Sequence, residues 1–174
     1  LKGRLSIQTN PRYYRDADKM LEHAEILVGL GPNMHVKMPA SEAGIIAMEE
    51  ATYRGISINA TVSFTVAQAV AVAEAVERGL KRRVAEGLPN EQMSPVCTIM
   101  IGRTDDWLKK YTDKQDILIN PECLEWGGVA VMKEAYRIYK ERGYRTKLLS
   151  AAYRNHYHWS QLIGGDIAMT IPYN

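Results

Sequence analysis

The chain has 174 residues, of which 46% are hydrophobic and 24% are charged. These proportions are those of a globular domain, and they exclude intrinsic disorder and fibrous repeats. With 22 Lys and Arg against 20 Asp and Glu, the net charge of +2 gives no general electrostatic reason to expect a nucleic acid or a membrane as partner. Any anion binding must therefore be local.

Nothing in the sequence predicts a secreted or membrane-bound protein. Cys97 and Cys123 show none of the spacings typical of a disulfide framework or a zinc site. No apolar run reaches the roughly 18 residues of a membrane span, and residues 1–4 lack the apolar core of a signal peptide. We therefore expect a cytoplasmic protein. The chain starts without Met and ends directly after an apolar strand pattern, so we expect that both of its ends are cut.

Six segments have the alternating or continuous apolar pattern of β-strands. In chain order these are residues 4–9, 34–38, 56–64, 96–101, 147–152 and 167–171. Between them, apolar residues three and four apart predict helices. The predicted helices cover residues 17–27, a segment capped by Ser41 that ends before Gly55, residues 66–85, 124–142 and 159–163. Residues 104–121 are predicted to be irregular, and the alternation as a whole predicts an α/β fold with a parallel sheet.

Two architectures are compatible with this alternation. A doubly wound open sheet fits the length, whereas a (β/α)8 barrel typically takes about 250 residues. Neither GxGxxG nor GxxxxGK[ST] occurs. The glycines of residues 29–32 end a predicted helix and do not form a phosphate-binding loop. The nucleotide-binding version of the open sheet therefore loses its main support.

Lys37 is a cation within a strand that is otherwise made for burial, MHVKMP at residues 34–39. Desolvation favours the neutral amine, which attacks ketones and aldehydes to form a Schiff base. Two structural interpretations compete: a lysine on an edge strand that reaches water, or one paired with a buried carboxylate. The residues alone favour a structural role.

Polar side chains recur within or just after the predicted strands. In residues 56–64, strand alternation places Asn59, Thr61 and Ser63 on one face, which fits the polar interior of a barrel better than a covered open sheet. The same placement is shared by Gln8, Thr98, Arg103 and Arg154. Active sites of parallel α/β folds gather at the carboxyl ends of the strands, so these residues are candidates for a site.

Four segments resemble the transaldolase family. Residues 35–44 read HVKMPASEAG and residues 55–64 read GISINATVSF. In that family one strand ends in Lys-hydrophobic-Pro-Ala, and the next segment reads Gly-Ile-x-hydrophobic-Asn-x-Thr-hydrophobic-x-Phe. Residues 101–103 (IGR) and 150–155 (SAAYRN) are similar to two later strand ends of the family. The four matches occur in the family's order.

The resemblance implies a (β/α)8 TIM barrel and class I aldolase chemistry, which needs no metal and no cofactor. Lys37 would form a Schiff base with a ketose phosphate and transfer a dihydroxyacetone unit between sugar phosphates, as in the pentose phosphate pathway. By this alignment the chain begins at the third strand. Residues 1–174 would then form one partial barrel domain, strands three to eight, truncated at both ends.

The resemblance also implies roles for other residues. Asn59 would hydrogen-bond the lysine or the substrate, and Thr61 would hold the catalytic water. Thr98 falls at the position of a substrate-binding serine and retains its hydroxyl. Arg103 and Arg154 fall at the positions of the phosphate-binding arginines, which would grip the anion in bidentate fashion.

Three positions depart from the family pattern. Gln8 stands where typical transaldolases have a glutamate that helps position water, as it does in the related fructose-6-phosphate aldolases, and a neutral amide cannot take a proton. Ala152 replaces a phosphate-site serine, and Met100 stands where the family has Phe or Tyr. The family's acid/base aspartate belongs to the first strand, which we expect to precede Leu1.

The sequence leaves several functions open. The leading one is a Schiff-base transaldolase, beside a simple fructose-6-phosphate-type aldolase, a non-catalytic sugar-phosphate-binding protein and an unrelated doubly wound binding module. We expect a sugar phosphate as ligand and a homo-oligomer that associates through an open sheet edge, or else a chain inactive alone. His156 and His158 form an HxH pair, to which we assign no metal because no acidic partner is near in sequence.

Overall fold

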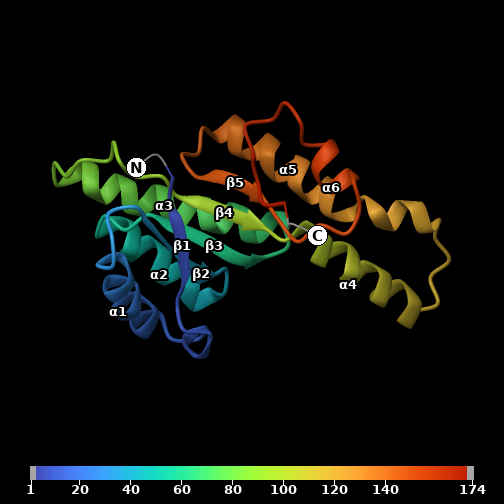
Figure 1. Cartoon of the computed structure of the whole chain (residues 1–174), viewed down its shortest axis with the longest axis horizontal. Coiled ribbons are helices and arrows are strands. Elements are labelled where there is room, and N and C mark those ends of the chain that lie inside the picture. Colours follow the sequence, from blue (N-terminus) through green and yellow to red (C-terminus); the bar gives the residue numbers. More distant parts are fainter. Residues whose placement is uncertain (1–2, 172–174) are drawn as a thin grey trace.

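Six parallel strands form one sheet in the computed structural model, which describes residues 3–171 (Figure 1). The strands are β1 (Leu5–Gln8), β2 (Met34–Pro39), β3 (Ile58–Ser63), β4 (Val96–Ile99), β5 (Lys147–Ser150) and β6 (Ala168–Met169). They lie in the sheet in chain order. A doubly wound sheet reverses its strand order part-way, and a barrel does not. The fold is therefore α/β with a sheet curled into a half-barrel, consistent with a partial TIM barrel.

The helices follow the strands. They are α1 (Ala17–Val28), α2 (Glu42–Tyr53), α3 (Val66–Ala85), α4 (Ile101–Lys114), α5 (Gly127–Arg142) and α6 (Tyr157–Ser160), with short 3-10 turns η1 (Pro11–Tyr13) and η2 (Pro121–Glu125). The predicted cap at Ser41 is confirmed, because its hydroxyl accepts the main-chain N–H of Gly44 at 3.1 Å. None of the described helices combines the length and the apolar character needed to cross a membrane.

Strand alternation divides the sheet into an apolar and a polar face. Val36, Met38, Ile58 and Ala60 are fully buried and belong to the same core as residues of α1, α2 and α3. Since successive side chains point to opposite faces, the residues between them, such as Lys37, point to the other side. That other side is the concave face of the sheet, and it carries the predicted site.

The structure corrects the prediction for residues 104–121. Residues up to Lys114 belong to α4, which starts directly after β4 and projects from the body of the molecule in Figure 1. Its buried stripe consists of Ile101, Gly102 and Asp105, so a charged residue stands where periodicity looks for an apolar one. The prediction therefore missed the helix. The later elements are shorter than predicted: β5 ends at Ser150, and α6 ends at Ser160.

A β-bulge interrupts the polar face of β3. The register with β4 shifts between Ala60 and Ser63, and Val62 within the shift has a φ of 53°. The bulge turns Ser63 away from Asn59 and Thr61: its side chain is fully buried beside the thiol of Cys97. The prediction that all three polar residues share one face is thus wrong for Ser63, because an extra residue reverses the alternation.

Candidate active site

A row of three predicted site residues crosses three strands on the concave face. Gln8 is opposite Lys37 in the β1–β2 register, and Lys37 is opposite Asn59 in the β2–β3 register. Residues paired in a parallel sheet direct their side chains to the same face, so these three emerge together. Thr61 follows two residues after Asn59, is 7% exposed and pairs with Pro39. The structure therefore brings all four predicted catalytic residues to one region.

Lys37 lies on an interior strand of the sheet and is half-buried. The interpretation of an edge-strand lysine is wrong, because β2 lies between β1 and β3. Within residues 3–171, the ion pairs include none to Lys37, so a buried carboxylate partner is also absent from that part of the chain. The main chain of Lys37 is anchored by Thr9. The carbonyl of Lys37 accepts hydrogen bonds from the N–H and the hydroxyl of Thr9 at 3.0 and 3.1 Å.

Gln8 also contributes to this main-chain anchor. Its Nε2 donates to the carbonyl of Lys37 at 3.2 Å. This contact uses one of the two amide hydrogens, so Gln8 can offer its amide oxygen and its second N–H to a ligand or water.

Asn59 is held rigidly beside the lysine. Its side chain is buried, its Nδ2 donates to Ser6 Oγ at 3.0 Å, and its Oδ1 accepts from Thr98 Oγ1 at 2.7 Å. Both ends of the amide are therefore fixed by hydroxyl groups from β1 and from β4. Thr98 is predicted to bind substrate. In this structure its hydroxyl donates a hydrogen bond to Asn59, so Thr98 orients that side chain.

The two predicted phosphate-binding arginines meet around a carboxylate. Arg154, in the segment after β5, donates from Nε and Nη2 to Asp106 of α4 at 2.8–3.2 Å. Its Nη1 donates to the carbonyls of Ala152 and Tyr153 at 3.0 and 3.1 Å. Arg103 is more exposed and approaches the same Asp106 only to 3.8 Å. These contacts use four of the five guanidinium N–H groups of Arg154.

Asp106 therefore changes the electrostatics of the arginine pair. The hydrogen bonds from Arg154 lower the pKa of the Asp106 carboxyl, so it is ionised at neutral pH. A bidentate grip of Arg154 on a phosphate would require Asp106 to move. Considering the contacts within residues 3–171, Arg103 and one N–H of Arg154 are what this arginine pair offers to an anion.

A cavity of about 650 Å³ lies beside these arginines, at the carboxyl ends of β3 and β4. Its lining includes Val62, Phe64, Met100, Trp107, Arg103 and Lys110. Met100, one of the departures from the family pattern, is thus part of an apolar wall. Sequence reasoning missed Lys110, although its spacing of seven residues from Arg103 places both cations on one face of a helix.

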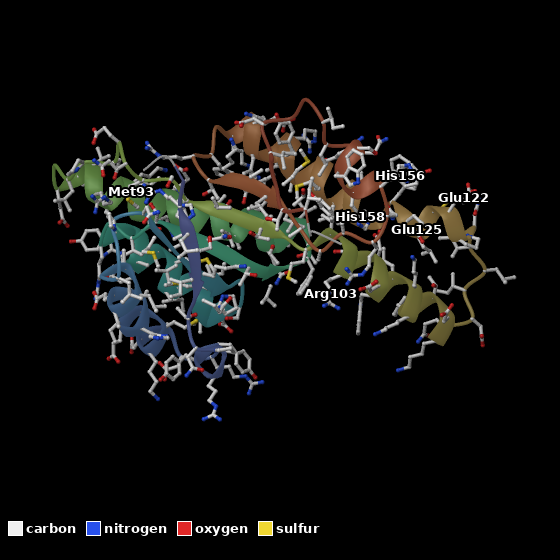
Figure 2. All side chains as sticks on the ribbon, viewed as in Figure 1. Met93, Arg103, Glu122, Glu125, His156 and His158 are labelled. Carbon is white, nitrogen blue, oxygen red and sulfur yellow. The ribbon has the colours of Figure 1, made fainter. Side chains whose placement is uncertain are left out.

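Sequence reasoning also missed the buried pair of Asp105 and His158. Both side chains are fully buried, and His158 Nε2 lies 2.6 Å from Asp105 Oδ2. In Figure 2, Arg103 lies at the start of α4 and His158 lies near Glu125, where α6 approaches η2. His156 is exposed and its ring lies tilted against Tyr157, whereas His158 is buried. The two histidines of the HxH pair therefore lie in different environments. Within residues 3–171, no group of three or more His, Cys, Asp or Glu side chains is arranged to hold a metal ion.

The comparison with known families agrees with this geometry. The family described as transaldolase/fructose-6-phosphate aldolase matches residues 1–174. The chain belongs to this family. A transaldolase of Glaesserella parasuis is 31% identical over 99% of this chain and 50% of its own length. A transaldolase of Acidothermus cellulolyticus is 31% identical over 80% of this chain and 38% of its own length. The chain therefore spans half or less of the length of these transaldolase-family relatives.

Proposed function

We propose that this transaldolase-family chain supplies the Schiff-base lysine and the phosphate-binding side of a transaldolase site. Lys37 is the nucleophile, and the substrate is a ketose phosphate from which a dihydroxyacetone unit passes to an acceptor aldehyde. The observation that carries the proposal is the row of Gln8, Lys37 and Asn59 across β1, β2 and β3, with Lys37 on the strand between the other two. Within residues 3–171, no ion pair or side-chain hydrogen bond gives the Lys37 amine a structural role.

The chemistry assigned to Lys37 is imine formation. The neutral Nζ attacks the carbonyl carbon of the ketose, and loss of one water from the carbinolamine gives the imine. Once protonated, the imine at C2 takes up the electron pair of the C3–C4 bond as an enamine. That bond breaks while the C4 hydroxyl passes its proton to the acid/base aspartate that the family resemblance implies, and C4 leaves as an aldehyde. Asn59, held by Thr98 and Ser6, is positioned to hydrogen-bond the lysine or the substrate, and Thr61 to hold a water.

A specific observation favours a second candidate, a sugar-phosphate-binding protein without turnover. Arg154 is already neutralised by Asp106. Gln8 cannot act as a base, because an amide does not take up a proton at neutral pH. Binding through Arg103 would persist under those conditions even if no carbon–carbon bond were broken.

Borohydride trapping tests the proposal. Incubation of the protein with fructose 6-phosphate and sodium borohydride reduces any imine to a stable secondary amine, and peptide mapping locates it. We expect the label on the peptide that contains Lys37. A folded protein that gains no label there contradicts the catalytic proposal, and binding of fructose 6-phosphate without a label supports the second candidate.

Two lysine variants make the result specific. Lys37→Arg keeps the positive charge but cannot form the imine, so it should abolish the label. Lys147→Arg is the matched control, because Lys147 is also a strand lysine, is about half exposed and pairs with Asp166 at 2.6 Å. It should leave labelling at Lys37 unchanged.

A further inference from the structure

The buried pair of Asp105 and His158 joins segments that are far apart in sequence. Asp105 lies on α4 and His158 on α6, and both side chains have no exposed surface. The second carboxylate oxygen of Asp105 accepts the N–H of Gly128, at the start of α5, at 2.6 Å. His158 Nδ1 accepts the main-chain N–H of Arg154 at 3.0 Å. Three separate segments are thus tied to one another through this pair.

These contacts determine the tautomer of His158. Because Nδ1 accepts a hydrogen bond from Arg154, it carries no proton, and the ring proton must be on Nε2. Nε2 then donates to Asp105 Oδ2. The nearby Asn155 Nδ2 lies 3.3 Å from Nε2, but it directs its two hydrogens at the main chain and carboxylate of Glu125. The imidazole is therefore neutral and fixed in one orientation.

Arg154 is held at both of its ends by consecutive acidic residues. Asp106 binds its guanidinium directly, and Asp105 acts on its main chain through His158. The N–H of Arg154 finds its acceptor on a side chain, outside the sheet. The segment also contains Ala152 with a φ of 63°, a conformation that costs energy for a residue other than glycine. An external tie is what keeps such a segment in place.

We propose that Asp105 and His158 form a positioning pair that sets the Arg154 main chain, and with it the one N–H of Arg154 left for an anion. His158 does not touch the substrate in this proposal. The inference rests on the proposed function only in taking the anion to be the phosphate of a sugar phosphate. It assigns these two buried residues a role in phosphate affinity, separate from the chemistry of Lys37.

Two substitutions of His158 separate positioning from packing. His158→Asn places its amide oxygen near the position of Nδ1, so it keeps an acceptor for Arg154 and loses the donor to Asp105. His158→Gln places its amide nitrogen near the position of Nε2, so it keeps the donor to Asp105 and loses the acceptor. If the pair only stabilised the fold, His158→Asn would be the more harmful variant, since it leaves a buried carboxylate without its partner.

The readouts are the Nε–H NMR signal of Arg154 and the affinity of the intact protein for inorganic phosphate. We expect His158→Gln to shift or lose that signal and to weaken phosphate binding roughly tenfold, the scale of one hydrogen bond to a charged group. His158→Asn keeps the acceptor for Arg154 and loses only the contact with Asp105 that orients it, so it should change both readouts less than His158→Gln does. Equal effects of the two variants, or a larger effect of His158→Asn on phosphate binding, would overturn the proposal.

A measurement on the unaltered protein does not depend on how the variants fold. The nitrogen chemical shifts of His158 should report a protonated Nε2 and an unprotonated Nδ1. A proton on Nδ1, or a wild-type protein that binds no inorganic phosphate, contradicts the positioning role. Failure of the Schiff-base proposal has a different signature, namely phosphate binding with normal His158 behaviour but no borohydride label on Lys37.

Discussion

The lysine row and the arginine region lie at the same edge of one sheet, but they are built differently. In the lysine row, the two residues paired with Lys37 are uncharged amides, and hydroxyl groups hold one of them, Asn59. In the arginine region, Asp106 pairs with Arg154 in a contact between residues 48 positions apart. Strand register alone assembles the first, whereas the second depends on how α4 packs. The difference indicates that the two regions can be disrupted separately.

Gly102→Ala should break the arginine region with the largest effect. A Cβ at this position would lie 1.9 Å from the carbonyl oxygen of Ala152 and 2.9 Å from Cγ of Arg154, so α4 and the Arg154 segment must move apart. We expect a loss of about 2–3 kcal/mol in the free energy of unfolding, measured by urea denaturation, the scale of overpacking a core.

Gly31→Ala is the matched control for that substitution. Its added Cβ meets no atom closer than 3.7 Å, an ordinary contact. We expect the free energy of unfolding of Gly31→Ala to stay close to that of wild type. If Gly102→Ala were equally close to wild type, α4 and the Arg154 segment would not be in the tight contact described.

Thr98→Val should damage the lysine row from within. The substitution keeps the shape of the side chain but leaves Asn59 Oδ1 buried without its donor, which costs about 1–3 kcal/mol. Ser6→Ala removes the other partner of Asn59 from an exposed strand and should cost less, because water can replace the hydroxyl. Urea denaturation of both variants measures this, and the reverse order would contradict the assignment of Thr98 as the main support.

Val62→Gly should relieve backbone strain in the bulge that lies between the two regions, and so raise the stability of the protein. A valine with a φ of 53° is strained by about 1–3 kcal/mol, and glycine relieves that strain while adding about 0.5–1 kcal/mol of backbone entropy cost. Because Val62 is 46% exposed, glycine also loses about half of the burial of the side chain, which offsets part of the gain. We expect a net stabilisation of up to about 1 kcal/mol by thermal denaturation. Val62→Ala keeps a Cβ and should not be stabilised, so equal behaviour of the two variants would argue against strain.

The smallest effect should be the acid dependence of the Asp106–Arg154 pair. The pKa of Asp106 is lowered in the folded protein, so its contribution to stability is complete above the ordinary value of 3.8 and is lost as the pH falls through the lowered pKa. A partly exposed pair of this kind contributes about 1 kcal/mol or less. The difference in unfolding free energy between wild type and Asp106→Asn should be constant from pH 5 to 7 and shrink below about pH 4. A difference that grows on acidification would contradict this sign.

Several features followed from local sequence patterns. The strand and helix alternation, the Ser41 cap and the long helix of residues 66–85 depend on residues within a few positions of one another, and the structure confirms them. The shared face of Asn59 and Thr61 also followed from the alternation of side chains along one strand. Helix α4, in contrast, was missed for a non-local reason, since Asp105 is buried by a partner 53 residues away that no periodicity can reveal.

By itself, the sequence determined the α/β class, the parallel strands and a strand position for each of Lys37, Asn59 and Thr61. The tertiary structure alone decided the strand order that favours a barrel over an open sheet, the bulge that turns Ser63 away, and the engagement of Arg154 by Asp106 and His158. The physical reason is the range of the interactions. Periodicity and capping act between neighbours along the chain, whereas ion pairs and buried hydrogen bonds form only once packing brings distant residues within about 3 Å.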